Sequence, residues 1–114
     1  MPSPFDAADS IHSAELLDAA DRIAFYLIGF DEFAFADDLR TIDAVCLNLI
    51  RIGEASKLLS PRAKAELPTV PWPDFIALRN RVAHGYATLR VDLLWSIATI
   101  DVPTIAARLR SASD

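Results

Sequence analysis

The stretch PWPDFIALRNRVAHGY, residues 71–86, decides how this chain folds and holds most of its reactive side chains. Pro73 and Asp74 are typical of a helix start, because the first turn of a helix does not need the N–H that proline lacks. Apolar residues then recur at helical spacing. Gly85 lets the chain leave the helix. The stretch therefore predicts a helix from about Pro73 to His84.

The second half of this stretch carries the candidate chemistry. Arginine has a planar cationic fork that suits phosphate oxygens, and histidine exchanges protons near neutral pH. Arg79 is therefore a candidate for stabilising charge on a phosphodiester, and His84 is a candidate for carrying its proton. Asn80, four residues before His84, is the natural side chain to orient the imidazole. Arg81 is a candidate substrate contact, and so are Arg90 and Lys57, although ordinary solvated charges explain these three equally well.

One ideal helix does not place Arg79 and His84 side by side. At about 100° per residue the two side chains point roughly 140° apart. Arg79 also falls inside the apolar arc of the helix, where a guanidinium needs a partner or an open cleft. Either the helix loosens around residues 83–85, or two copies of the helix face each other at a dimer interface.

Apolar periodicity predicts further helices on both sides of this stretch. The expected ranges are about 6–28, 36–59, 61–66 and 92–100, with a short turn near 33–35 and a last short helix ending near 110. Ser60 followed by Pro61 is a strong helix start, and Asp101-Val102-Pro103 predicts a joint. The predicted fold class is all-α, an antiparallel bundle of four to five helices with short connections.

The helix expected over residues 36–59 is apolar on more than one side. Its stripe consists of Leu39, Ile42, Cys46 and Leu49, widened by Val45, Ile50 and Ile52. Such a helix is either central in the bundle or shared with a second subunit. Arg51 and Glu54 lie three residues apart on it and are interpreted as a surface ion pair. The lone cysteine, Cys46, is interpreted as a core residue.

Length and composition limit the classes of protein that remain. The 114 residues predict one domain, 1–114, and a hydrophobic content of 53% excludes general disorder. A net charge of −5 counts against a broad RNA-coating surface but leaves room for a small electropositive site. The sequence contains no secretion signal, membrane-length apolar run, metal-ligand cluster or phosphate loop. We therefore expect a cytoplasmic protein without membrane association, metal or cofactor.

The chain resembles the HepT-like family of the HEPN superfamily, whose hallmark is Arg, four residues, His, one residue and Tyr. Arg79, His84 and Tyr86 occupy these positions. The likeness extends to RIGEASKLLS (51–60) and VDLLWSIATIDVPTIAARL (91–109). It covers roughly the last three-quarters of the chain, and the first helix matches only in character.

The resemblance implies a metal-independent endoribonuclease that is the toxin of a type II toxin–antitoxin pair. The RNA, an mRNA or a tRNA, would be left with a 2',3'-cyclic phosphate end. The resemblance also implies a homodimer with paired motifs lining a shared cleft. Its partner would be a minimal nucleotidyltransferase (MNT-type) antitoxin that modifies Tyr86 with AMP, since a bulky anion beside Arg79 and His84 repels an RNA backbone.

Two other interpretations remain open. The chain can be a non-catalytic helical dimer that binds and regulates a nucleotidyltransferase, which the acidic composition favours. It can also be a helical protein in which Arg79 makes an internal ion pair and His84 only ends a helix. The extended match to the HepT-like blocks argues against this last interpretation.

Overall fold

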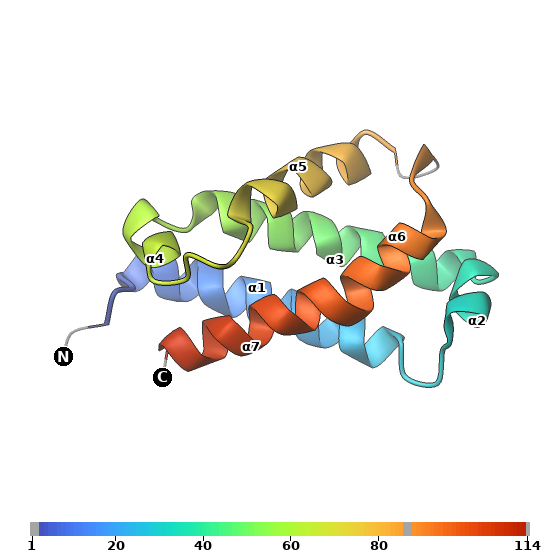
Figure 1. The fold of residues 1–114 in the computed structure, drawn as a ribbon, viewed down its shortest axis with the longest axis horizontal. Coiled ribbons are helices and arrows are strands. Elements are labelled where there is room, and N and C mark those ends of the chain that lie inside the picture. Colours follow the sequence, from blue (N-terminus) through green and yellow to red (C-terminus); the bar gives the residue numbers. More distant parts are fainter. Residues whose placement is uncertain (1–2, 86–87, 114) are drawn as a thin grey trace.

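The fold is an antiparallel bundle of helices, with its long axis horizontal in Figure 1. The computed structural model describes residues 3–85 and 88–113, and none of these residues lies in a β-strand. The elements are α1 (Ala7–Tyr26), α2 (Glu32–Ala36), α3 (Leu39–Leu58), α4 (Pro61–Ala65), α5 (Trp72–Ala83), α6 (Val91–Ser96), the π-helical turn η2 (Ile97–Asp101) and α7 (Val102–Ser113). The predicted all-α fold class is confirmed.

Helix α3 lies at the centre of the bundle, between α1 and α5 (Figure 1). Helix α7 packs against α1, and α6, η2 and α7 follow one another as a continuous rod. The short helices α2 and α4 lie in the connections at opposite ends of the bundle (Figure 1). The sequence predicted that this helix, which is apolar on more than one side, is either central in the bundle or shared with a second subunit. In the structure it lies at the centre of the bundle of one chain.

Several helices begin at a side chain that accepts a hydrogen bond from a backbone N–H of the first turn. These side chains are Asp6, Asp31, Asp38 and Ser60. They satisfy N–H groups that have no partner within the helix. Ser60 Oγ accepts from Ala63 at 3.1 Å and Pro61 follows it, so the helix start predicted at Ser60-Pro61 is confirmed.

Asp9 joins the start of α1 to the start of α4. Its carboxylate is 2% exposed and accepts hydrogen bonds from the N–H and the Oγ–H of Ser60, at 2.8 and 2.7 Å. The N–H of Asp6 donates a third hydrogen bond at 3.3 Å. Burial alone raises the pKa of a carboxyl, but these hydrogen bonds outweigh it and hold the pKa of Asp9 below its ordinary value.

The core runs along the whole length of the bundle. The largest fully buried side chains include Leu16, Ile23, Phe35, Leu49, Ile52, Leu94, Ile105 and Leu109. Trp95 packs against Phe35 with their ring centroids 5.4 Å apart. Cys46 is buried as predicted, and this burial raises the pKa of its thiol to about 11.

The apolar pattern assigned Leu39 to the buried stripe of α3, and this prediction is wrong. Leu39, the first residue of α3, is 75% exposed and therefore lies outside the core. The other predicted positions are buried or partly buried: Ile42, Val45, Cys46, Leu49, Ile50 and Ile52.

The ion pair predicted between Arg51 and Glu54 is also wrong. Arg51 instead contacts Glu15 at 2.6 Å and Asp18 at 2.9 Å, both on α1. Glu54 contacts Arg79 of α5 at 2.6 Å. Because α3 lies between α1 and α5, Arg51 and Glu54 each have a partner on a different neighbouring helix.

The joint predicted at Asp101-Val102-Pro103 does not end a helix. The chain continues through the π-helical turn η2, in which the N–H of Val102 donates to the carbonyl of Ile97. Pro103 has no N–H and its ring crowds the preceding turn of a regular α-helix. A wider turn at this point lets α7 follow directly, so the proline alters the helix without breaking it.

Candidate functional site

Helix α5 crosses α3 at Gly53, and the two backbones approach closely there. A Cβ atom added to Gly53 would lie 2.1 Å from Cβ and 2.8 Å from Cγ of Arg79. It would also lie 2.9 Å from the carbonyl oxygen of Phe75. The stem of the Arg79 side chain therefore rests directly on the backbone of α3, in a space that only glycine leaves open.

The guanidinium of Arg79 has one partner on each of two helices. Its Nε lies 2.6 Å from Oε1 of Glu54 on α3, and its Nη1 donates a hydrogen bond to Oδ1 of Asn80 at 3.2 Å. The Nε atom is buried and makes no directed hydrogen bond, so the contact with Glu54 is an ion pair by proximity. The sequence predicted that Arg79 needs either a partner or an open cleft, and the structure gives it a partner, Glu54.

His84 ends α5 and its side chain is exposed. Its backbone N–H donates to the carbonyl of Asn80, and the N–H of Gly85, whose φ is 124°, donates to the carbonyl of Val82. The helix therefore ends where the sequence allowed it to loosen. No hydrogen bond or ion pair joins Arg79 to His84 in the described part of the chain, so this ending does not by itself bring the two side chains together.

The other predicted site residues occupy different positions. Asn80 directs its side-chain oxygen to Arg79, and its link to His84 runs through the backbone carbonyl. Lys57 is exposed on α3, and Arg90 pairs with Asp92 two residues later. Tyr86 lies outside the described residues.

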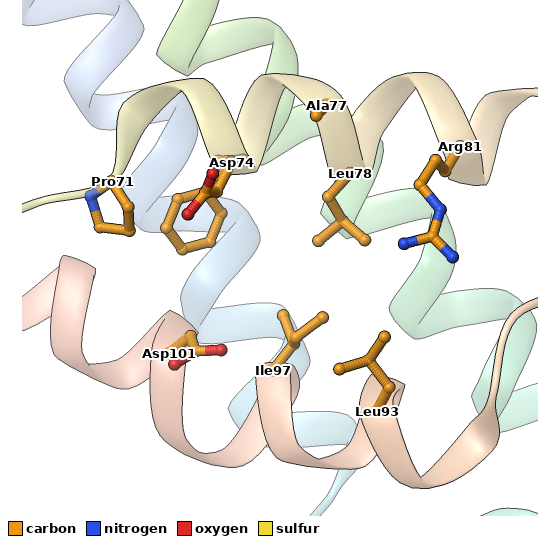
Figure 2. A pocket seen from close by; sticks show the side chains of 9 residues that line it. Pro71, Asp74, Ala77, Leu78, Arg81, Leu93, Ile97 and Asp101 are labelled. Carbon is orange, nitrogen blue, oxygen red and sulfur yellow. The ribbon is translucent and has the colours of Figure 1, made fainter.

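Arg81 borders a cavity between α5 and the α6–η2 segment, as Figure 2 shows. This cavity has a volume of about 400 Å³ and is lined by Pro71, Asp74, Phe75, Ala77, Leu78, Arg81, Leu93, Ile97 and Asp101. Leu78 and Ile97 point toward each other across its middle, and Asp74 and Asp101 lie at the end away from Arg81 (Figure 2). Two carboxylates repel a phosphate backbone, so the acidic end of this cavity does not suit RNA.

Sequence reasoning missed Gly53 and Glu54 as neighbours of the motif. The sequence did contain a signal at Gly53. A glycine inside a helix lowers helix stability relative to alanine, and its presence there often means that another segment packs closely against it. No such signal marked Glu54, since its partner is 25 residues away in sequence, the difference between positions 79 and 54.

Neither a metal-ligand cluster nor a membrane-spanning helix occurs among the described residues. No three or more of their His, Cys, Asp and Glu side chains are grouped so that they could hold a metal ion. Among the helices of residues 3–85 and 88–113, none combines the length and apolar character needed to cross a membrane.

Comparison with known proteins places this arrangement in a family. The profile described as "Ribonuclease HepT-like" matches residues 16–112. The chain therefore belongs to the HepT-like ribonuclease family of the HEPN superfamily.

Two archaeal relatives cover most of the chain. "Putative RNase MJ1380" of Methanocaldococcus jannaschii is 32% identical over 91 residues, which is 80% of this chain and 84% of the relative. "Probable ribonuclease HepT" of Thermococcus cleftensis is 31% identical over 100 residues, 85% of this chain and 91% of the relative. No solved structure gives a significant match. These relatives support an RNase of the HEPN type.

Proposed function

We propose that this protein is the toxin of a type II toxin–antitoxin system and acts as a metal-independent endoribonuclease in the cytoplasm. The observation that carries the proposal is the site at the end of α5. There, Arg79, whose guanidinium contacts Glu54, and the exposed His84 occupy the hallmark positions of a HepT-like ribonuclease.

The proposed reaction uses a nucleophile that RNA itself supplies. The 2'-oxygen attacks the adjacent phosphorus, the bond to the 5'-oxygen breaks, and the products are a 2',3'-cyclic phosphate and a 5'-hydroxyl end. His84 moves the proton released by the 2'-hydroxyl or the proton taken up by the leaving oxygen. Arg79 stabilises the charge that develops on the phosphoryl oxygens, and Asn80 supports its guanidinium through the hydrogen bond from Nη1.

We further propose that the working unit is a homodimer. No hydrogen bond or ion pair joins Arg79 to His84 within the described residues of one chain, and a second copy of α5 offers a way to bring the two side chains together. Leu47 and Leu58 on α3 support such a contact, because their side chains are 61% and 54% exposed. On a helix of about 100° per residue both lie within about 40° of Glu54, so the apolar surface adjoins the site.

Regulation of the toxin follows from the same site. An MNT-type nucleotidyltransferase antitoxin would bind the dimer and transfer AMP from ATP to Tyr86. The tyrosyl oxygen forms a bond to the α-phosphorus and pyrophosphate leaves. Because Tyr86 follows His84 by two residues, the added nucleotide brings negative charge next to the site and repels the substrate RNA, whether mRNA or tRNA.

The test is an RNA cleavage assay with the purified chain in the presence of a chelator. We expect cleavage with cyclic phosphate ends, and we expect Arg79→Ala and His84→Ala to abolish it while each variant keeps its helical content. Arg40→Ala, an exposed arginine at the start of α3, is the matched control, and Arg81→Ala tests the predicted substrate contact. A chelator-sensitive activity or full activity of either motif variant contradicts the proposal.

The net charge of −5 favours a second candidate, a non-catalytic helical dimer that binds and regulates a nucleotidyltransferase. A chain that binds the nucleotidyltransferase encoded beside it, but leaves total RNA intact in both its modified and unmodified forms, would select this candidate. Intact mass of the chain expressed alone and with its neighbour, compared with the Tyr86→Phe variant, shows whether AMP is added.

A further inference from the structure

Glu54 lies beside the motif arginine without belonging to the motif. It follows Gly53 on α3, and its Oε1 is 2.6 Å from Nε of Arg79. The side chains of Glu54 and Arg79 are 41% and 36% exposed, so both are partly open to solvent although Nε itself is buried. A phosphate can therefore reach the guanidinium while Glu54 remains in contact with it.

The contacts of Arg79 determine which part of the guanidinium faces a substrate. The stem is fixed against Gly53, Nε is buried beside Glu54, and Nη1 donates to Asn80. An arginine has five N–H donors, and two of them are on Nη2. This nitrogen donates no hydrogen bond among residues 3–85 and 88–113, so its N–H groups are the ones left to donate to a phosphate oxygen.

We infer that Glu54 is a positioning residue of the ribonuclease site, which fixes the Arg79 guanidinium so that Nη2 faces the scissile phosphate. This inference rests on the proposed function. The physical reason is that a donor already oriented in the free enzyme does not have to reorganise when charge develops in the transition state. A guanidinium held only by its stem and by Asn80 rotates among several orientations, and few of them suit the reaction.

Three possible roles of Glu54 predict different kinetics. A positioning role predicts that its loss lowers kcat with little change in KM, because Arg79 acts on the transition state. A shielding role, in which Glu54 competes with RNA for Arg79, predicts a lower KM and an unchanged kcat. A purely structural role predicts lower stability and unchanged kinetics of the folded protein.

The experiment compares cleavage kinetics of the full-length wild type with Glu54→Ala, Glu54→Gln and Glu32→Ala. We expect kcat to fall about 10- to 100-fold in Glu54→Ala, as misplacement of a reacting group does. Glu54→Gln, which keeps an acceptor oxygen at the same reach, should recover part of this loss. Glu32 is exposed on α2, so Glu32→Ala makes the same charge change away from the site and should keep the wild-type kcat.

A second readout does not depend on RNA cleavage. In nitrogen-15 NMR spectra we expect the Nε–H signal of Arg79 to be distinct and slow to exchange in the wild type, because this atom is buried beside Glu54. In Glu54→Ala it should move to the averaged position of exposed arginines. If Glu54→Ala does not fold, the same two measurements on Glu54→Gln decide the question.

The outcomes separate this inference from the proposed function. An active wild type, a lowered kcat in the Glu54 variants and a changed Arg79 signal support the inference. An active wild type with an unchanged kcat in folded Glu54 variants, or a lowered KM alone, overturns the inference and leaves the ribonuclease standing. A wild type that never cleaves RNA overturns the proposed function, and with it any role of Glu54 in cleavage.

Discussion

The two sides of α5 are packed in opposite ways. Toward α3, a Cβ atom on Gly53 would stand 2.1 Å from Cβ of Arg79, so not even a methyl group fits. Toward α6 and η2, a cavity of about 400 Å³ separates apolar side chains of the two segments (Figure 2). The same helix therefore has one closely packed side and one open side.

This difference explains where the motif arginine can be held in a single orientation. Arg79 is on the closely packed side, with its stem against Gly53 and its charge beside Glu54. Arg81 is on the open side, beside the cavity. A side chain on a surface with free volume has more rotamers available than one pressed against a backbone, so only the α3 side suits a preorganised group.

The largest effect is expected for Gly53→Ala, which tests whether the α3–α5 contact is as rigid as its distances indicate. Alanine gains about 1 kcal/mol of helix propensity over glycine. The overlap with Arg79 and with the backbone of Phe75 costs more, as overpacking of a core does. We expect a net loss of about 2 kcal/mol in the free energy of unfolding, measured by urea denaturation, together with loss of RNA cleavage. Unchanged stability would show that α5 can move away from α3 freely.

Cys46 on α3 provides a probe of the same contact. Its thiol is 1% exposed, and burial, followed by the nearby charge of Asp43, raises its pKa to about 11. A thiol reagent should therefore label it only when the bundle opens. A loss of about 2 kcal/mol in Gly53→Ala should raise the labelling rate about 30-fold at mildly alkaline pH. Because the chain has one cysteine, all labelling can be attributed to Cys46. Equal labelling rates in the wild type and in Gly53→Ala would contradict the expectation.

The contact between Asp9 and Ser60 is made by hydrogen bonds, so its contribution to stability can be compared with that of the packing at Gly53. In Asp9→Asn the amide N–H₂ group faces donors of Ser60, and we expect a loss of about 1–2 kcal/mol in the free energy of unfolding near neutral pH.

The pH dependence of this loss has a defined sign. The pKa of Asp9 is lowered in the folded state, because hydrogen bonds from Ser60 and Asp6 outweigh the effect of burial. Its contribution is therefore fully present above the ordinary pKa of 3.8 and disappears as the pH falls below that value. The stability difference between wild type and Asp9→Asn should shrink in the same range. Asp37→Ala, an exposed aspartate on the C-terminal end of α2, is the control.

The smallest effect is expected for Ala77→Leu, the counterpart of Gly53→Ala on the open side of α5. Ala77 is exposed and lines the cavity, so the larger side chain has free space. We expect the free energy of unfolding to change by about 0.5 kcal/mol or less, with RNA cleavage unchanged. A loss comparable to that of Gly53→Ala would remove the distinction between the two sides.

Much of the fold could be predicted because it depends on local signals. Pro73 and the periodic apolar residues after it locate α5, and Ser60-Pro61 locates the start of α4. Predictions that needed knowledge of neighbouring helices were less successful. Spacing on one helix predicts a pair between Arg51 and Glu54, whereas their partners in the structure lie on α1 and α5. Pro103 was expected to end a helix, but packing of α7 against α1 maintains the rod through a π-helical turn.

Periodicity, caps and motif spacing are properties of residues that are neighbours in the chain. The all-α class, the helix positions and the candidate residues Arg79, His84 and Tyr86 could therefore be predicted before the fold was known. Helix packing, in contrast, was needed to show that Arg79 rests on Gly53, that Glu54 is its charged partner, and that α5 has a closely packed and an open side. The physical reason is that these contacts depend on how closely two helices approach each other. That distance is determined by side chains far apart in the sequence.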